Sequence, residues 1–139
     1  MKIYFDTNII IDILKRREPF YNDSNKIFML AVDGQVDGII GTSAITDIFY
    51  LLRKQYNDTR TVVGIILDIL EIIKPVNTLI SDIYLAAELG FSDFEDAVVA
   101  AISQRENADY ILTRNENDFS GSGVSAITPR AFLENFKKV

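Results

Sequence analysis

The sequence predicts an α/β domain in which a short, mostly parallel β-sheet is flanked by helices. Short apolar runs of strand length alternate along the 139 residues with longer segments whose apolar residues recur at helical spacing. This alternation is typical of βαβ units, whose parallel sheets are covered by helices on both faces. An apolar share of 48% and a charged share of 24%, with no low-complexity run, favour a single folded domain over residues 1–139.

The first strand and the two helices after it are predicted from the N-terminal quarter of the chain. Residues 2–5, "KIYF", form a β-leaning apolar run that ends at Asp6. Residues 8–16, "NIIIDILKR", have apolar side chains at helical spacing and a basic end, which suits a helix C-terminus. A second helix is predicted over residues 21–34, because Gly34 can close it in the left-handed conformation.

The remaining elements follow from the same patterns. A buried strand is predicted over residues 38–43, "GIIGTS", in which Thr42 or Ser43 caps the helix that follows. Pro129 suits the first turn of the last helix, which continues through residues 130–138. Between these, helices are predicted over 44–56, 59–73, 79–90 and 94–106, and strands over 74–76, 109–113 and 124–128.

The composition restricts the chemistry that the chain can perform. Cysteine and histidine are both absent, which excludes disulfides, Cys- or His-ligated metals and the Ser-His-Asp triad. A net charge of -6 disfavours nonspecific attraction to polyanions and anionic membranes, although basic residues can still gather on one surface. The N-terminus lacks the features of a secretory signal, and the apolar stretches are too short to span a bilayer. We therefore expect a soluble, cytoplasmic protein with no membrane association.

Acidic residues follow two of the predicted strands. Asp6 comes directly after the first strand, while Glu116 and Asp118 follow the strand at 109–113. In open parallel sheets, ligands usually bind beyond the carboxyl ends of the strands, so these acids belong at the ligand-binding edge. Each also has a purely structural interpretation: Asp6 can cap the following helix, and Asp118 can form an Asx turn.

Three further acids lie near the starts of predicted helices. Asp47 falls in the first turn of its helix, where it either complements the helix dipole or, if partly buried, needs a cation. Asp93 and Asp96 are three residues apart, so they are neighbours on one helical face and repel each other unless a cation is bound. Alternatively, Asp93 is the N-cap and Asp96 the third helical residue; both interpretations can hold together.

Four separate regions of the chain therefore deliver carboxylates to one edge of the sheet. Oxygen ligands of this kind suit Mg²⁺ or Mn²⁺. A cation held there lowers the pKa of a water nucleophile and stabilises charge on a leaving oxygen. In a chain without histidine, this is the predicted route to hydrolysis.

The segments that carry these acids resemble the PIN-domain family, and in particular small bacterial and archaeal proteins related to VapC-type toxins. The resemblance covers essentially the whole chain through "KIYFDTNIIIDIL", "TSAITDIFYLLRK", "FSDFEDAVVAAISQRENADYILTRNENDF" and "ITPRAFL". It implies a three-layer fold, with a parallel sheet between helices, and RNA cleavage that depends on Mg²⁺ or Mn²⁺. It also implies a homodimer and, for a toxin, a small antitoxin partner.

The resemblance assigns roles to individual residues. Asp6 matches the family's first acid and Asp96 its third, while Asp47 stands where the family most often has Glu. Asn115 stands where an Asp is common, so Asp118 takes the role of the fourth acid or Asn115 offers a neutral oxygen. Asp93 is a cap or an auxiliary ligand. The polar neighbours that the resemblance places around the site are Thr7, Asn8, Ser43, Thr113 and Asn115.

The sequence thus predicts a metal-dependent endoribonuclease, with an alternative left open. The departures at Asp47 and Asn115 also suit a catalytically weak or inactive protein that acts as a binding module. A haloacid-dehalogenase-type phosphatase is disfavoured, because Asn8 stands where that chemistry needs a second Asp. Candidate RNA phosphate contacts, each of which can equally be a solvated surface residue, are Lys15, Arg16, Arg17, Arg53, Lys54 and Arg114.

Overall fold

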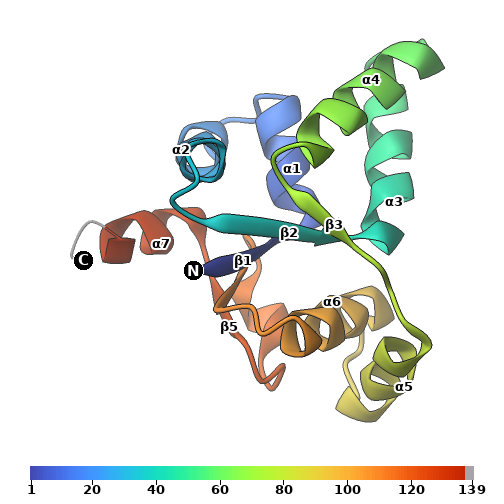
Figure 1. Ribbon diagram of the computed structural model, residues 1–139, viewed down its shortest axis with the longest axis vertical. Coiled ribbons are helices and arrows are strands. Elements are labelled where there is room, and N and C mark those ends of the chain that lie inside the picture. The colour runs from blue at the N-terminus through green and yellow to red at the C-terminus, as the bar shows by residue number, and fades with distance from the viewer. Residues whose placement is uncertain (137–139) are drawn as a thin grey trace.

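The computed structural model describes residues 1–136 and contains a five-stranded parallel sheet with helices on both faces (Figure 1). The strand order is β3-β2-β1-β4-β5. The strands are β1 (Lys2–Phe5), β2 (Asp37–Gly41), β3 (Lys74–Val76), β4 (Tyr110–Leu112) and β5 (Ser125–Ile127). The helices are α1 (Thr7–Leu14), α2 (Tyr21–Val32), α3 (Thr42–Arg53), α4 (Thr59–Leu70), α5 (Ile80–Leu89), α6 (Phe94–Arg105), the 3-10 turn η1 (Glu116–Phe119) and α7 (Pro129–Phe136).

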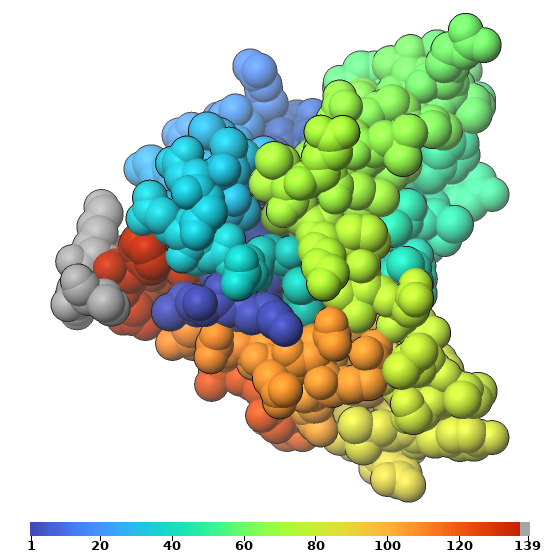
Figure 2. All heavy atoms as spheres, in the orientation of Figure 1, coloured from blue at the N-terminus to red at the C-terminus, as the bar shows by residue number. Residues whose placement is uncertain are grey.

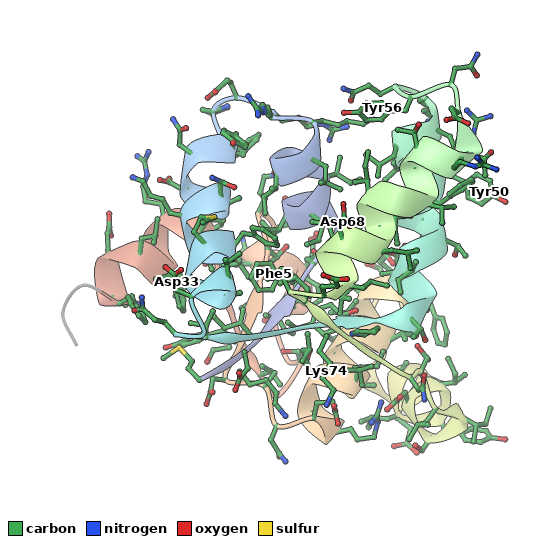
Figure 3. The ribbon with its side chains drawn as sticks, turned by 45° about the horizontal axis from the view of Figure 1, so that its top comes forward. Phe5, Asp33, Tyr50, Tyr56, Asp68 and Lys74 are labelled. Atoms are coloured by element: carbon green, nitrogen blue, oxygen red, sulfur yellow. The ribbon has the colours of Figure 1, made fainter. Side chains whose placement is uncertain are left out.

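Two hydrophobic cores, one on each face of the sheet, make the fold a three-layer sandwich. Alternate residues of a strand point to opposite faces. Accordingly, Ile3 and Phe5 pack into the core beneath α1 to α4, whereas Tyr4 packs into the core against α6. Figure 3 shows Phe5 between the sheet and the helices above it. This arrangement confirms the predicted α/β fold class with helices on both faces.

The second strand and the helix after it differ from the prediction at their junction. The strand ends at Gly41, which is itself the N-cap of α3, so Thr42 and Ser43 lie inside the helix and cap nothing. The close approach of Tyr4 explains the glycine: a Cβ at position 41 would lie 2.9 Å from the Tyr4 hydroxyl oxygen. That oxygen instead accepts a hydrogen bond of 3.0 Å from the Gly41 N–H.

Other boundaries differ by a few residues. The first helix starts one residue early, at Thr7, because Asp6 caps it. The helix predicted to residue 73 ends at Leu70, and Ile73 leaves it to become fully buried in the core. The last helix begins at Pro129 as predicted, but residues 137 and 138 of its predicted range lie outside the described residues.

The sheet brings the predicted acids to one edge because β1 and β4 are neighbours. Phe5 pairs with Leu112 at the carboxyl end of both strands. One residue further, the Asp6 N–H donates a hydrogen bond of 3.0 Å to the Leu112 carbonyl. Figure 2 shows the molecule hollowed between the α3–α4 lobe and the α5 lobe, and β2 points towards this side in Figure 1.

Candidate active site

Asp6 is the most constrained acid at the carboxyl edge. Its side chain is 8% exposed. One oxygen, Oδ1, accepts a hydrogen bond of 2.9 Å from the Thr7 N–H. The other, Oδ2, accepts one of 2.8 Å from the Thr113 hydroxyl and a longer one of 3.4 Å from the Asn8 amide. Asp6 is therefore both a helix cap and a carboxylate fixed at the edge of the sheet.

Some of the polar neighbours predicted around the site bind Asp6 by hydrogen bonds, and others lie further away. Thr7, Asn8 and Thr113 all donate to Asp6, as described above. The carbonyl oxygen of the Asn8 side chain is buried without a hydrogen-bond partner. Ser43 lies elsewhere, in a cavity of about 160 Å³ that Tyr4 also lines. The structure thus places three of these residues on Asp6 and Ser43 at the neighbouring cavity.

Asp93 and Asp96 meet at the start of α6, where the structure confirms the predicted capping role of Asp93. Asp93 is the N-cap, and its Oδ1 accepts a hydrogen bond of 3.2 Å from the Asp96 N–H. This interaction satisfies one of the free N–H groups at the helix start. The Asp96 side chain remains available, because only its backbone takes part in the cap.

Asp118 lies on η1 and faces the start of α6. Asp93, Asp96 and Asp118 line one groove of about 590 Å³, whose other walls are the α5–α6 connection and the segment after η1. Asn115 precedes η1, and its N–H donates a hydrogen bond of 3.2 Å to the Thr113 hydroxyl. Of the two residues that were alternatives for the fourth acid, Asp118 is the one that lines this groove.

Asp47 is exposed and lies in the second turn of α3 and not in the first, because the helix begins at Thr42, two residues before the predicted start. Its carboxylate is close enough to Glu95 to raise the pKa of that residue, after burial as the larger cause. Glu95 also feels Asp93 and Asp6, and it lines the cavity that contains Ser43. Sequence reasoning had not placed Glu95 in the site, although its position beside Asp96 was the available signal.

Electrostatic coupling unites these acids. Burial first, and then neighbouring carboxylates, raise the pKa of Asp96 to about 7. In decreasing order of effect, these carboxylates belong to Asp93, Asp6, Asp118 and Glu95. Burial likewise raises the pKa of Asp6, although hydrogen bonds from Thr113 and Thr7 oppose the shift. Like charges at this edge are therefore incompletely balanced by the protein itself.

The donor set suits a hard divalent cation, since it consists of carboxylates with amide and hydroxyl oxygens nearby. Among residues 1–136, however, no three acidic side chains converge closely enough to hold a metal ion as they stand. The residues therefore suit a divalent cation by the type of their donor atoms and by their closeness to one another. Mg²⁺ usually keeps several waters and only one or two carboxylate ligands, so it does not require three converged acids.

Basic residues predicted as RNA contacts gather where α1 and α3 end, at the opposite ends of these helices from the carboxyl edge. Burial lowers the pKa of Lys15, and the charges of Arg17 and Lys54 lower it further, so these three cations are neighbours. Arg16 lies over the ring of Tyr21, with 5.7 Å between its guanidinium carbon and the ring centroid. Arg53 donates to the Tyr56 carbonyl over 3.0 Å. The two basic segments of the sequence thus meet around Lys15.

Arg114 has a partner that the sequence did not indicate. Its Nε lies 2.8 Å from Oδ2 of Asp12, a carboxylate on α1 that is fully buried. Its guanidinium also covers the ring of Phe20, with 4.2 Å between the guanidinium carbon and the ring centroid. The helical pattern over residues 8–16 did not indicate that Asp12 is buried, because an acid on an amphipathic helix usually faces solvent.

Comparison with known proteins gives consistent results. The model of the PIN domain family matches residues 2–117. The chain is 23% identical to a protein named Ribonuclease VapC1 from Aquifex aeolicus (strain VF5), over 97% of this chain and 95% of the relative. Over residues 1–136, no helix is both long and apolar enough to cross a membrane.

Solved structures share the fold. VapBC-1 from nontypeable Haemophilus influenzae matches with a TM-score of 0.71 and 15% identity, over 94% of this chain and 99% of that one. VapBC2 from Rickettsia felis, bound to a DNA fragment from its promoter, matches with a TM-score of 0.68 and 18% identity, over 92% and 98% of the two chains. The family match extends over most of the chain, through the segments that carry Asp6, Asp47 and Asp96. The chain therefore belongs to the PIN domain family.

Proposed function

We propose that this protein is a metal-dependent endoribonuclease that hydrolyses RNA phosphodiester bonds. The observation that carries the proposal is the gathering of acids from separate chain regions at the carboxyl edge of a PIN-domain sheet, where burial and then the neighbouring carboxylates raise the pKa of Asp96 to about 7. The similarity to a protein named as a ribonuclease supports the assignment of substrate class. The cytoplasm, where RNA is accessible, is the proposed location.

Asp6, Asp96 and Asp118 are the proposed main ligands of Mg²⁺ or Mn²⁺, with Asp47, Asp93 and Glu95 as the surrounding acids. When bound, the cation would promote ionisation of a water nucleophile and neutralise charge on the phosphodiester. Thr113 and Thr7 hold the two oxygens of Asp6 in a fixed orientation, which reduces the reorganisation needed at the site.

The basic cluster at the far ends of α1 and α3 is proposed to hold the RNA backbone. Burial lowers the pKa of Lys15, and repulsion from the nearby charges of Arg17 and Lys54 lowers it further. Phosphates placed there would relieve this repulsion, because cation–phosphate contacts release counterions and favour binding. The acids and the cations thus have separate roles: the acids act at the scissile bond, and the cations position the flanking strand.

The proposal is tested by measuring cleavage of structured and single-stranded RNAs with Mg²⁺ or Mn²⁺. Asp96→Asn should lower kcat by about 100-fold or more, since metal-site ligands and their supports commonly have effects of this size. Glu116→Gln is a matched control, because Glu116 is an exposed acid on the same turn as Asp118. Equal activity of wild type and Asp96→Asn would overturn the assigned site. Calorimetry that detects no saturable Mn²⁺ binding dependent on Asp6 and Asp96 would favour the binding-module alternative.

We further propose that the protein is the toxin of a toxin–antitoxin pair. Structural relatives include a toxin–antitoxin complex from Klebsiella pneumoniae, which is 22% identical to this chain with a TM-score of 0.65. An antitoxin segment would cover the acidic edge, with an Arg among the carboxylates as a charge-assisted partner. Co-expression with a neighbouring gene product tests this: toxicity that the neighbour does not relieve would contradict it.

A homodimer is also proposed, in keeping with the family resemblance. Large apolar side chains on the outer helices remain exposed, among them Tyr50 and Ile80 at 68% and 69%. Figure 3 shows Tyr50 pointing outwards from α3. Sedimentation analysis would test the proposal, and a monomer at concentrations of tens of micromolar would argue against a stable dimer.

A further inference from the structure

We propose that Arg114, held between Asp12 and Phe20, is a positioning residue that fixes the turn carrying Asp118 against the acidic edge. The inference rests on the proposed function, because the edge matters only if it holds a cation. Arg114 is proposed to act through Asp118 and not by contact with the RNA.

The anchor of this arrangement is a carboxylate that solvent does not reach. Asp12 is 0% exposed, and its Oδ2 lies 2.8 Å from the Arg114 Nε. Arg17 is the second cation near it, at 4.0 Å from Oδ1. Neither Asp12 oxygen receives a well-directed hydrogen bond, so the contact with Arg114 is off the N–H direction. The buried charge therefore depends mainly on the proximity of the Arg114 cation.

The contact between Arg114 and Asp12 can affect Asp118 because Arg114 lies next to residues that are hydrogen-bonded to the site and to the turn. Arg114 follows Thr113, whose hydroxyl donates to Asp6 and also accepts from the Asn115 N–H. The Asn115 carbonyl in turn accepts a hydrogen bond of 3.0 Å from the Asp118 N–H. An unbroken series of contacts thus connects buried α1 to Asp118. Loss of the contact between Arg114 and Asp12 would leave the segment from Thr113 to Asp118 without its attachment to α1.

The same contacts leave Arg114 poorly suited to bind a phosphate. Its charge is matched by Asp12, and one face of its guanidinium is covered by Phe20 at 4.2 Å. Withdrawal of Arg114 towards a phosphate would leave the Asp12 charge buried with Arg17 alone at 4.0 Å. Of the basic residues predicted as RNA contacts, this one is therefore assigned an internal role.

A second ion pair in the same molecule provides a matched control. Asp82 on α5 is 2% exposed and pairs with Arg105 of α6, which is 27% exposed, the same fraction as Arg114. Arg105 lies nine residues after Asp96 on α6, about 13 Å along the helix axis. Loss of this pair should destabilise the fold by a comparable route without touching the turn that carries Asp118.

The experiment compares Arg114→Gln with Arg105→Gln in three measurements. Arg114→Gln should weaken Mn²⁺ binding and lower kcat by about tenfold or more each, with the KM for a short RNA within about threefold, as expected for a residue that orients ligands. Arg105→Gln should lower the melting temperature but leave the Mn²⁺ Kd and kcat within about threefold of wild type. Hydrogen exchange at residues 113–119, without metal, should speed up in Arg114→Gln only.

A double variant separates stability from position. Asp12→Asn combined with Arg114→Gln removes both charges, so the melting temperature should recover relative to Arg114→Gln, because no unpaired charge stays buried. The Mn²⁺ Kd should remain weakened, since the turn is still not held. Full recovery of the Mn²⁺ Kd in the double variant would overturn the positioning role.

Other outcomes also decide the matter. A raised KM with unchanged Mn²⁺ affinity in Arg114→Gln would show that Arg114 contacts RNA, and equal effects of the two arginine variants would show a general loss of stability. If wild type neither binds Mn²⁺ nor cleaves RNA, the proposed function fails by itself. In that case the exchange experiment still tests the inference, and unchanged exchange at 113–119 in Arg114→Gln would overturn it.

Discussion

The acids at the carboxyl edge and the bases at the far ends of α1 and α3 form two clusters of opposite charge. At the start of α6, burial and then the neighbouring carboxylates raise the pKa of Asp96 to about 7. At the far ends of α1 and α3, burial lowers the pKa of Lys15, and the charges of Arg17 and Lys54 lower it further. A bound cation would reduce the repulsion among the acids, and a bound phosphate would reduce the repulsion among the bases. The net charge of -6 conceals this division, which is a better guide to function than the total.

The substitution expected to have the largest effect on the acidic cluster is Asp96→Asn. Activity should fall by about 100-fold or more, whereas the free energy of unfolding of the metal-free protein at pH 8 should rise by about 1–2 kcal/mol. The gain is expected because the variant removes one of several repelling carboxylates. Thermal or urea unfolding in the presence of a chelator measures it. Lower stability together with lost activity would mean that Asp96 supports the fold.

The pH dependence of stability sharpens the same point. The folded protein holds the Asp96 proton up to about pH 7, while the unfolded chain releases it near the ordinary pKa of an aspartate, 3.8. The unfolded state therefore binds fewer protons between these values, and stability of the metal-free protein should decline as pH rises from about 4 to 7. Partial exposure screens the effect, so we expect about 2 kcal/mol, roughly half of what the full shift implies.

Two comparisons check that the decline belongs to the acidic cluster. Saturating Mg²⁺ should flatten the curve, because a bound cation favours the ionised carboxylates. Asp96→Asn should reduce the slope relative to wild type, and the slope that remains belongs to the other carboxyls with a raised pKa, Asp6 and Glu95 among them. A stability curve that rises from pH 4 to 7 by the same amount in wild type and variant would contradict the assignment of a raised pKa to Asp96.

Asp47 and Glu95 can be ranked by paired substitutions. Glu95 feels Asp47, Asp93 and Asp6, whereas Asp47 is an exposed residue of α3. Glu95→Gln should therefore weaken Mn²⁺ binding by about three- to tenfold, and Asp47→Asn by less. Calorimetric titration of the two variants gives the comparison directly. The reverse ranking would restore Asp47 to the place that the family resemblance gives it.

The basic cluster is expected to yield the smallest effects. Lys54→Gln should weaken RNA binding by about threefold and reduce the slope of log K against log salt by roughly one contact. The site of binding is best isolated in the Asp96→Asn background, where RNA is not cut. Lys26→Gln is a control, because it removes an exposed lysine of α2 outside the Lys15 cluster. Equal salt slopes for the two variants would remove Lys54 from the interface.

The sequence predicted the edge well and the pairing of side chains poorly. Asp6 and Thr113 were placed correctly, because adjacent parallel strands end at the same edge whatever the details of packing. The N-cap role of Asp93 also followed from local spacing. In contrast, the junction at Gly41 depends on how closely Tyr4 approaches it from another strand. Local patterns favour Thr42 or Ser43 as a cap and contain no information about that contact.

The same limit applies to Arg114 and Asp12. The pair joins residues 102 positions apart, and each looks ordinary in its own segment: a base after a strand, an acid on an amphipathic helix. Burial makes them a unit, and burial of a polar residue is a tertiary property. Glu95 was missed for a related reason, since two of the charges that act on it, those of Asp47 and Asp6, come from other parts of the chain.

The Tyr4 hydroxyl that fits against Gly41 gives this protein an intrinsic optical reporter. The chain has no tryptophan, so tyrosine dominates its near-ultraviolet absorption. Tyr4 is 1% exposed, and burial, together with the nearby charges of Asp6 and Glu95, keeps the pKa of its phenol raised. A change of charge at the acidic edge acts on that ring through a medium that screens it weakly. Occupancy of the edge can therefore be followed as a tyrosine difference spectrum, without a dye or label, and identified by its loss in Tyr4→Phe.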